Sequence, residues 1–277
     1  MPNLTRAVLK QSLTKSIQTK EKSFQLLKAI VEVGEGGLDT QAGAVASSVQ
    51  KAFASTAVTT TFTGSTTAVS LAATVLSFLA AYFANHPVAV YADSLPQIVP
   101  CIVKIMSDKY QRTSIEAFNA ASKLARGMRP NVASPSAINP LPSAQVNAIK
   151  TIFDATCQVL AGTMADSEVK EKATLTLGDL LVCEADALAQ QVDQALPLLT
   201  ARLSAEATQL AALQVVGNVA ESAICKAAVF DNWLLAVLDT LPMLFKRSAR
   251  GVKPMALSTL NKVLARSVHP KSRVSTC

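Results

Sequence analysis

The feature that most constrains this chain is an internal repeat of small and apolar residues. Six segments with helix-favouring composition carry such residues at positions i, i+4 and i+7, which lie on one face of an α-helix. The first members of successive sets are separated by 46, 45, 56, 39 and 44 residues. The six sets are Leu26/Ile30/Val33, Ala72/Leu76/Leu79, Ala117/Ala121/Leu124, Ala173/Leu177/Leu180, Ala212/Val216/Val219 and Ala256/Leu260/Val263.

A period near 45 residues is typical of repeats built from a pair of helices, as in HEAT and armadillo proteins. The long interval has a visible cause, because residues 129–144 form a Pro/Ser-rich insert with four prolines. Removing about a dozen loop residues restores the period. The sequence therefore predicts an all-α fold: a right-handed α-solenoid of about six HEAT/armadillo-type helix pairs, with residues 1–277 as one solenoid.

The first helix of each pair leaves its own signal. The segments 94–106, 195–203 and 240–247 each carry Leu-Pro near their start, followed by apolar residues at helical spacing. Proline suits the first turn of a helix, where its missing N–H would have no partner. Each unit is thus expected to hold a helix A that starts at Leu-Pro, a short turn, and a helix B that carries the small residues.

Boundary signals divide the repeats further. The GEGG run at 34–37 is expected to end the first B helix. The Thr-rich segment 55–67 is expected to be a loop within the second repeat, and it blurs the register of residues 1–67. Residues 267–277 are expected to be a polar tail.

The charge is unevenly distributed. The chain carries a net +7, but residues 1–28 contribute +5, residues 29–245 contribute −6 and residues 246–277 contribute +8. A nucleic-acid-binding protein more often carries a basic stripe through the body of its fold, so nucleic acid is not an expected partner. The densest basic cluster is Lys246, Arg247, Arg250 and Lys253, which we interpret as a solvated turn, with an acidic partner as the alternative.

One stretch requires a membrane test. Residues 68–84, AVSLAATVLSFLAAYFA, contain no charged residue and reach the short limit for a membrane span. The stretch also contains Ser70, Thr74 and Ser77, and much of the rest is alanine, which contributes little to membrane insertion. A helix buried among neighbouring helices explains it better, so no membrane partner is expected.

The residues of catalytic and metal sites are sparse. Both histidines, His86 and His269, precede a proline and are expected in exposed loops. The carboxylates Asp179, Glu184 and Asp186 are expected at a helix end or on an exposed face. No phosphate-binding loop or metal-ligand spacing is present, so the sequence predicts no enzyme, cofactor or metal site.

The five cysteines point to a cellular location. They are far apart in the sequence, so no zinc-site or redox-pair spacing is present, and their number is odd. This pattern suits reduced, buried thiols in a cytoplasmic or nuclear protein. The cysteines are Cys101, Cys157, Cys183, Cys225 and Cys277.

Three segments resemble one family in particular. Residues 85–130 have an Asn-His turn, a Pro-started helix that ends in an Asp-x-Tyr turn, and a helix that closes on Arg-Pro before the insert. Residues 166–188, with their Glu-Val-Lys-Glu opening, and residues 195–222 continue the likeness. Over residues 68–266 the chain resembles the central HEAT repeats of the cullin-associated, neddylation-dissociated proteins.

The resemblance implies a non-enzymatic assembly factor, cytoplasmic and nuclear, that binds unneddylated cullin–RING ubiquitin ligases (cullin and RING subunit) and promotes exchange of substrate receptors. Family members are several times longer, so a second chain that completes the solenoid is an implied partner. Exposed B-helix positions are the expected contacts. We predict a partner-binding set of Arg112, Lys123, Arg126, Lys172 and Lys262.

A transport receptor of the importin type is the alternative, since it also uses HEAT repeats. Such a receptor would bind a small GTPase and basic cargo through acidic inner helices. The net −6 of residues 29–245 is compatible with that alternative.

Overall fold

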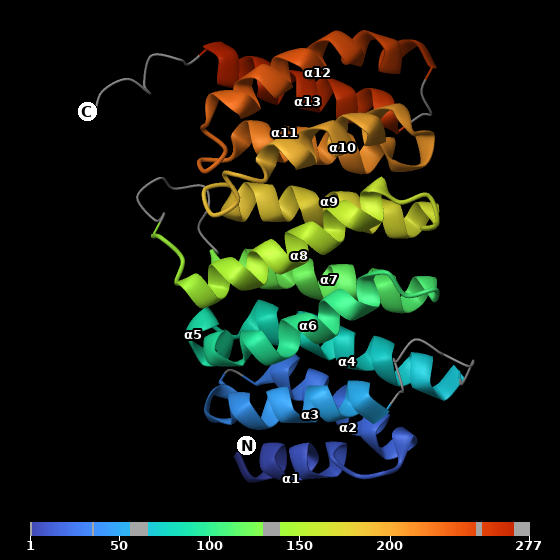
Figure 1. Ribbon diagram of the computed structural model, residues 1–277, viewed down its shortest axis with the longest axis vertical. Coiled ribbons are helices and arrows are strands. Elements are labelled where there is room, and N and C mark those ends of the chain that lie inside the picture. The colour runs from blue at the N-terminus through green and yellow to red at the C-terminus, as the bar shows by residue number, and fades with distance from the viewer. Residues whose placement is uncertain (1, 35, 56–65, 130–138, 248–250, 269–277) are drawn as a thin grey trace. The chain divides into compact units, whose positions relative to one another are not determined.

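The computed structural model describes residues 2–34, 36–55, 66–129, 139–247 and 251–268. Regular structure in these ranges is entirely helical (Figure 1). The chain divides into two compact units, one of Met1–Pro130 with Leu141–Val159, and one of Asn131–Pro140 with Leu160–Cys277. They are called unit 1 and unit 2 below.

Unit 1 stacks helix pairs. The B helices α2, α4 and α7 lie side by side, with α4 between the other two, while α3 packs on α6. Figure 1 shows α3 and α6 as one layer of this unit in front of the B helices. The helices of unit 1 are α1 (Pro2–Ser12), α2 (Ile17–Val33), α3 (Ala42–Ser55), α4 (Thr66–Asn85), the short α5 (Val88–Tyr91), α6 (Leu95–Met106), α7 (Gln111–Met128) and most of α8 (Ser143–Ala161).

Unit 2 repeats the arrangement. Its B helices are α9, α11 and α13, and α11 packs between the other two. The A helices α10 and α12 each precede a B helix in the chain. The helices of unit 2 are α9 (Ser167–Glu184), α10 (Val192–Ser204), α11 (Gln209–Glu221), α12 (Ala228–Arg247) and α13 (Val252–Val268).

Each of the six residue sets lies in a B helix, which confirms the helix-pair repeat and the all-α fold class. The first set locates the right helix, but only its middle residue, Ile30, is buried, since Leu26 is 44% exposed and Val33 is 84% exposed. The buried face of α2 also includes Phe24, Leu27 and Val31.

The Leu-Pro signal is right for one A helix and wrong for two. Pro96 stands in the first turn of α6, as predicted. Pro197 and Pro242 instead lie inside α10 and α12, which begin earlier, at Val192 and Ala228. Both prolines are exposed, so water can satisfy the carbonyl oxygen that each leaves without an intrahelical partner.

The other boundaries agree only in part. Gly34 caps α2, so the GEGG run ends that helix as predicted. The predicted loop at 55–67 is too long, because residue 55 ends α3 and residues 66–67 begin α4, and the last two residues of the insert at 129–144 belong to α8. The expected tail also begins too early, since residues 267–268 end α13. Residues 56–65, 130–138 and 269–277 lie outside the described residues.

Helix α4 is the apolar stretch that required the membrane test. It is buried between α2 and α7, as predicted, and the Phe78 ring packs 5.5 Å from that of Phe24 and 5.8 Å from that of Tyr82. By length and composition alone, Thr66–Asn85 and Val88–Met106 are both apolar enough to cross a membrane, with 56% and 39% of their apolar windows buried. Buried core helices meet the same criterion, so it carries little weight.

His86 corrects a prediction. Its side chain is 1% exposed, its Nδ1 lies 2.7 Å from Asp39 Oδ1, and its ring packs on Tyr82. The turn after α4 folds against the loop before α3, so a loop position does not make this side chain exposed. His269 lies outside the described residues.

Two carboxylates also depart from expectation. Asp179 lies inside α9 and is buried, and Glu184 ends that helix, as expected, but is fully buried. Asp186 is exposed, as expected. The sequence pattern places Asp179 wrongly because it assumes that a helix has one exposed, polar face. Most of α9 is buried on more than one side, and Asp179 lies in this buried part.

The ends of the B helices in unit 2 are capped by the next repeat. Ser222 Oγ donates to the carbonyl oxygen of Val182 at 3.0 Å, and Cys225 Sγ lies 3.3 Å from that of Leu181. At the end of α11, the Arg266 guanidinium donates to the carbonyls of Val219, Ala220 and Cys225 and pairs with Asp231. These donors add side-chain hydrogen bonds to carbonyl groups at or just after the helix ends, where intrahelical partners run out, although the Leu181 and Val219 carbonyls also accept from the main-chain N–H groups of Ala185 and Ser222.

Candidate protein-binding surface

Helix α7 carries an ordered row of polar side chains. The spacing of four, three, four and three residues places five residues on one helix face, about 21 Å long at 1.5 Å per residue. We call it the α7 row. Its members are Arg112, Glu116, Asn119, Lys123 and Arg126, of which the three basic residues are exposed and the other two half-buried.

The opposite face and the first turn hold α7 in place. Ala117, Phe118, Ala121 and Leu124 are fully buried against the unit. In the turn before α7, Thr113 Oγ1 lies 2.8 Å from Asp108 Oδ2 and 2.7 Å from the carbonyl oxygen of Tyr110. The α7 row is therefore displayed by a helix that is fixed both by its core and by its N-terminal turn.

The neighbouring B helix adds no charge beside this row. The sequence of α4, residues 66–85, contains no Asp, Glu, Lys or Arg. Its half-buried Ser70 and Ser77 form hydrogen bonds with side chains of α2. Ser70 Oγ lies 2.7 Å from Glu21 Oε1, and Lys28 Nζ lies 2.9 Å from Ser77 Oγ. Glu21 and Lys28 of α2 thus each contact a serine of α4, and Lys28 Nζ also lies 3.7 Å from Glu32 Oε1 of its own helix.

The other two predicted contact residues lie in unit 2. Lys172 is half-buried near the start of α9. Lys262 of α13 lies with its Nζ 2.8 Å from Glu221 Oε2 of α11, so it links two B helices. The structure thus brings Arg112, Lys123 and Arg126 together on one helix and places Lys172 and Lys262 on separate helices.

The basic cluster near the end of the chain is only partly described. Lys253 is exposed in the first turn of α13. The side chains of Lys246, Arg247 and Arg250 lie outside the described residues. The solvated-turn interpretation of this cluster stays a prediction.

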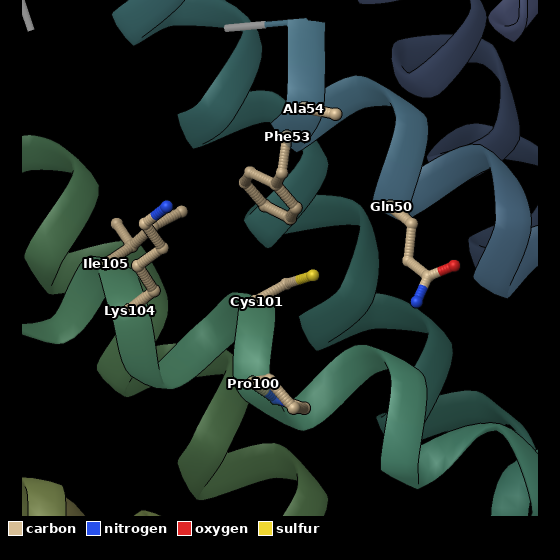
Figure 2. A pocket seen from close by; sticks show the side chains of 7 residues that line it. All are labelled: Gln50, Phe53, Ala54, Pro100, Cys101, Lys104 and Ile105. Atoms are coloured by element: carbon tan, nitrogen blue, oxygen red, sulfur yellow. The ribbon is translucent and has the colours of Figure 1, made fainter. Parts of the chain in front are cut away.

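The A-helix side of unit 1 contains a hollow of about 320 Å³ between α3 and α6 (Figure 2). The Cys101 thiol and the Phe53 ring extend into it. Burial raises the pKa of Cys101, although the nearby Lys104 lowers it, so the thiol stays largely protonated near neutral pH. The lining residues are Gln50, Phe53, Ala54, Pro100, Cys101, Lys104 and Ile105.

Sequence analysis missed this hollow, because it depends on how far apart two A helices pack and no sequence period reports that distance. The buried thiols are as expected for Cys157, Cys183 and Cys225, while Cys101 is partly exposed. Cys277 lies outside the described residues. Among the described residues, no group of three His, Cys, Asp or Glu side chains could hold a metal ion.

Stacked helix pairs with a polar row on a B helix define a helix-pair repeat scaffold. The family model described as "CAND1-like, TPR repeats" matches residues 36–177, half of the chain and the part that includes α7. The chain belongs to this CAND1-like family.

Individual relatives agree. The Drosophila melanogaster protein named cullin-associated NEDD8-dissociated protein 1 is 24% identical over 274 residues, which cover 95% of this chain and 20% of that protein. An Emericella nidulans protein named as the C-terminal part of cullin-associated NEDD8-dissociated protein 1 is 24% identical over 282 residues, covering 99% of this chain and 26% of that protein. The chain therefore spans about a fifth to a quarter of the length of these relatives.

Solved structures bear out the fold. A designed armadillo repeat protein in complex with the peptide (KR)4 matches with a TM-score of 0.62 at 14% identity, over 93% of this chain and 98% of that chain. Kap121p bound to Ste12p matches with a TM-score of 0.58 at 13% identity, over 94% of this chain and 29% of that chain. At such identities the likeness establishes the armadillo/HEAT-type fold alone.

Proposed function

We propose that this chain is a binding scaffold for unneddylated cullin–RING ubiquitin ligases, and that it contributes part of a surface that promotes exchange of their substrate receptors. The observation that carries the proposal is membership of the CAND1-like family over residues 36–177. Relatives matched over nearly the whole chain carry names that contain the words cullin-associated and NEDD8-dissociated.

The mechanism would be differential binding. A scaffold that contacts one assembly state better than another shifts the balance between them without forming or breaking a covalent bond. Rigid B helices suit this role, because their side chains are already in position before the partner arrives. The contact residues we propose are Arg112, Lys123 and Arg126 in unit 1, together with Lys172 and Lys262 in unit 2.

We propose that the RING subunit belongs to the bound assembly and that a second chain carrying further repeats extends the surface. This follows from the length of the relatives, of which this chain matches a fifth to a quarter. Both the cytoplasm and the nucleus are proposed locations.

The test is co-purification of the recombinant chain with a purified cullin–RING complex, prepared both without NEDD8 and with NEDD8 attached. We expect retention of the unmodified complex, weaker retention of the modified one, and stronger retention when flanking repeats are supplied as a separate chain. Failure to retain either complex, with or without the added repeats, would sink the proposal.

The importin-type receptor is tested in the same assay with a small GTPase loaded with GTP or GDP. The net −6 of residues 29–245 supports that alternative. The α7 row weighs against it, since three exposed cations would repel basic cargo at that helix. Nucleotide-dependent GTPase binding without cullin binding would favour the transport receptor.

A further inference from the structure

We propose that the α7 row is a docking surface for an acidic segment of a partner protein. The inference deepens the proposed function, and rests on it only in naming the cullin–RING assembly as the source of that segment. The chemistry of the surface follows from unit 1 itself.

The row has a surplus of positive charge in a fixed geometry. Arg112, Lys123 and Arg126 are exposed, and Glu116 is the single acid among the five members, so the row carries a net +2. Arg112 and Lys123 are separated by about 16 Å along the helix axis, and Lys123 and Arg126 by about one turn. A partner with carboxylates at two such positions would meet both ends of the row.

The neighbouring helix α4 adds no charged residue of its own beside the row, because its sequence contains no Asp, Glu, Lys or Arg. On α2, Glu21 contacts Ser70 of α4, and Lys28 contacts Ser77 of α4 and pairs with Glu32 of its own helix. An acidic segment over α7 would therefore find attraction from the row without a competing carboxylate from α4.

A protein segment fits this row better than a nucleic acid does. Glu116 stands between Arg112 and Lys123 and would repel a continuous phosphate backbone. In an extended acidic peptide successive side chains point to opposite sides, so the carboxylates that face the row lie about 7 Å apart and can lie on either side of Glu116. Single-stranded binding also requires several aromatic platforms. The row itself contains no aromatic residue.

The test uses two fluorescent octapeptides of opposite charge, one alternating Asp and Glu, (DE)4, and one alternating Lys and Arg, (KR)4. An extended octapeptide reaches about 26–29 Å, enough to span the row. We expect anisotropy to show binding of (DE)4 in preference to (KR)4, and weaker binding as salt increases.

The decisive variant is R112E/K123E, and its matched control is K51E/K104E. Lys51 and Lys104 are exposed on α3 and α6 of the same unit, so the control makes the same change of net charge on the A helices. We expect R112E/K123E to lose about tenfold or more of the (DE)4 affinity and the control to stay within about twofold. Circular dichroism confirms that both variants remain helical.

Three results would overturn the inference: equal losses in both variants, no loss in R112E/K123E, or tighter binding of a single-stranded oligonucleotide than of (DE)4 at the row. The outcome of the cullin–RING assay does not depend on the outcome of the peptide assay. Binding of (DE)4 at the row without cullin–RING binding would remove the proposed function and leave the acidic docking surface standing.

Discussion

The two units build the same stack of B helices with different side chains. In unit 1, α2, α4 and α5 meet through rings: Phe24, Phe78, Tyr82, Phe83 and Tyr91 pack with centroid separations of 5.0 to 6.0 Å. The contact of α7 with α4 in unit 1 is of another kind, because a Cβ added at Gly127 would stand 2.6 Å from the Phe83 carbonyl oxygen. In unit 2, the described residues of α9, α11 and α13 meet through aliphatic side chains, glycines and hydrogen bonds to main-chain carbonyls.

The contrast shows what a helix-pair repeat requires. The repeat requires only that each B helix has an apolar face against which the next B helix can pack. Rings contribute large buried area. Small residues allow closer approach, where a backbone carbonyl becomes reachable by a serine, a cysteine or an arginine of the next repeat. The following predictions test this contrast.

The largest effect is expected for Phe78→Ala in unit 1. The change removes a fully buried ring between Phe24 and Tyr82, and Phe-to-Ala changes in cores typically cost about 3–5 kcal/mol. Amide hydrogen exchange should show lost protection in α2, α4 and α7. In unit 2 the fully buried Val216, changed to Ala, should cost less because it removes far fewer buried atoms, and an equal cost would contradict the importance of the rings in unit 1.

The second prediction compares the change in stability caused by replacing two glycines of unit 2 with alanine. A Cβ added at Gly178 would stand 2.4 Å from Val215 Cγ2, whereas at Gly217 the nearest atom is the flexible Lys262 Cδ at 3.2 Å. Gly178→Ala should therefore destabilise by about 1–3 kcal/mol, since overpacking forces neighbouring groups to shift. Gly217→Ala should be neutral or gain up to about 1 kcal/mol of helix propensity.

Denaturant unfolding measures both glycine variants. Val215→Ala should partly relieve Gly178→Ala, so that the double variant loses less than the sum of the single losses. Additive losses would show that α9 and α11 do not meet at this point.

The third effect concerns the caps. Arg266→Met keeps the length of the side chain but removes the donor from the carbonyls of Val219, Ala220 and Cys225 and also the ion pair with Asp231. Leaving buried acceptors without a donor costs about 1–3 kcal/mol, and the end of α11 should exchange faster. Lys262→Met, which loses only the half-exposed pair with Glu221, should cost less than about 1 kcal/mol. Equal costs would contradict the capping role.

The smallest effect is chemical. Burial raises the pKa of Cys157 and of Cys225 to about 12, and raised values leave less thiolate, roughly 10⁻⁴ of the total at pH 8 for a pKa near 12. In a Cys277→Ser background, iodoacetamide at pH 8 should therefore modify Cys101 first, as followed by mass spectrometry. Alkylation of Cys225 as fast as that of Cys101 would show that the helix-end cap of unit 2 opens readily.

The helix-pair repeat could be predicted from the sequence because small residues recur where B helices contact each other. The sequence did not predict which face of a helix is buried or which residues distant in sequence are in contact. Leu26 and Val33 share the right spacing but are exposed, whereas Phe24 and Leu27 of the same helix are buried. His86 looked exposed because a proline follows it, yet Asp39 reaches it from a loop 47 residues earlier.

The candidate surface, too, could be predicted only in part from the sequence. Arg112, Lys123 and Arg126 could be predicted together because one helix fixes their spacing. Lys262 could not be judged from sequence, because its partner Glu221 lies on another helix. The prediction of a single solenoid over residues 1–277 stays a prediction.

The most direct test of the central claim is amide hydrogen exchange of the chain with and without an unmodified cullin–RING complex. If B helices of a CAND1-like scaffold form the binding surface, the complex should slow exchange in α7, and R112E/K123E should abolish that change while K51E/K104E retains it. Slowed exchange confined to the A helices α3 and α6, or no change at any helix, would contradict the account.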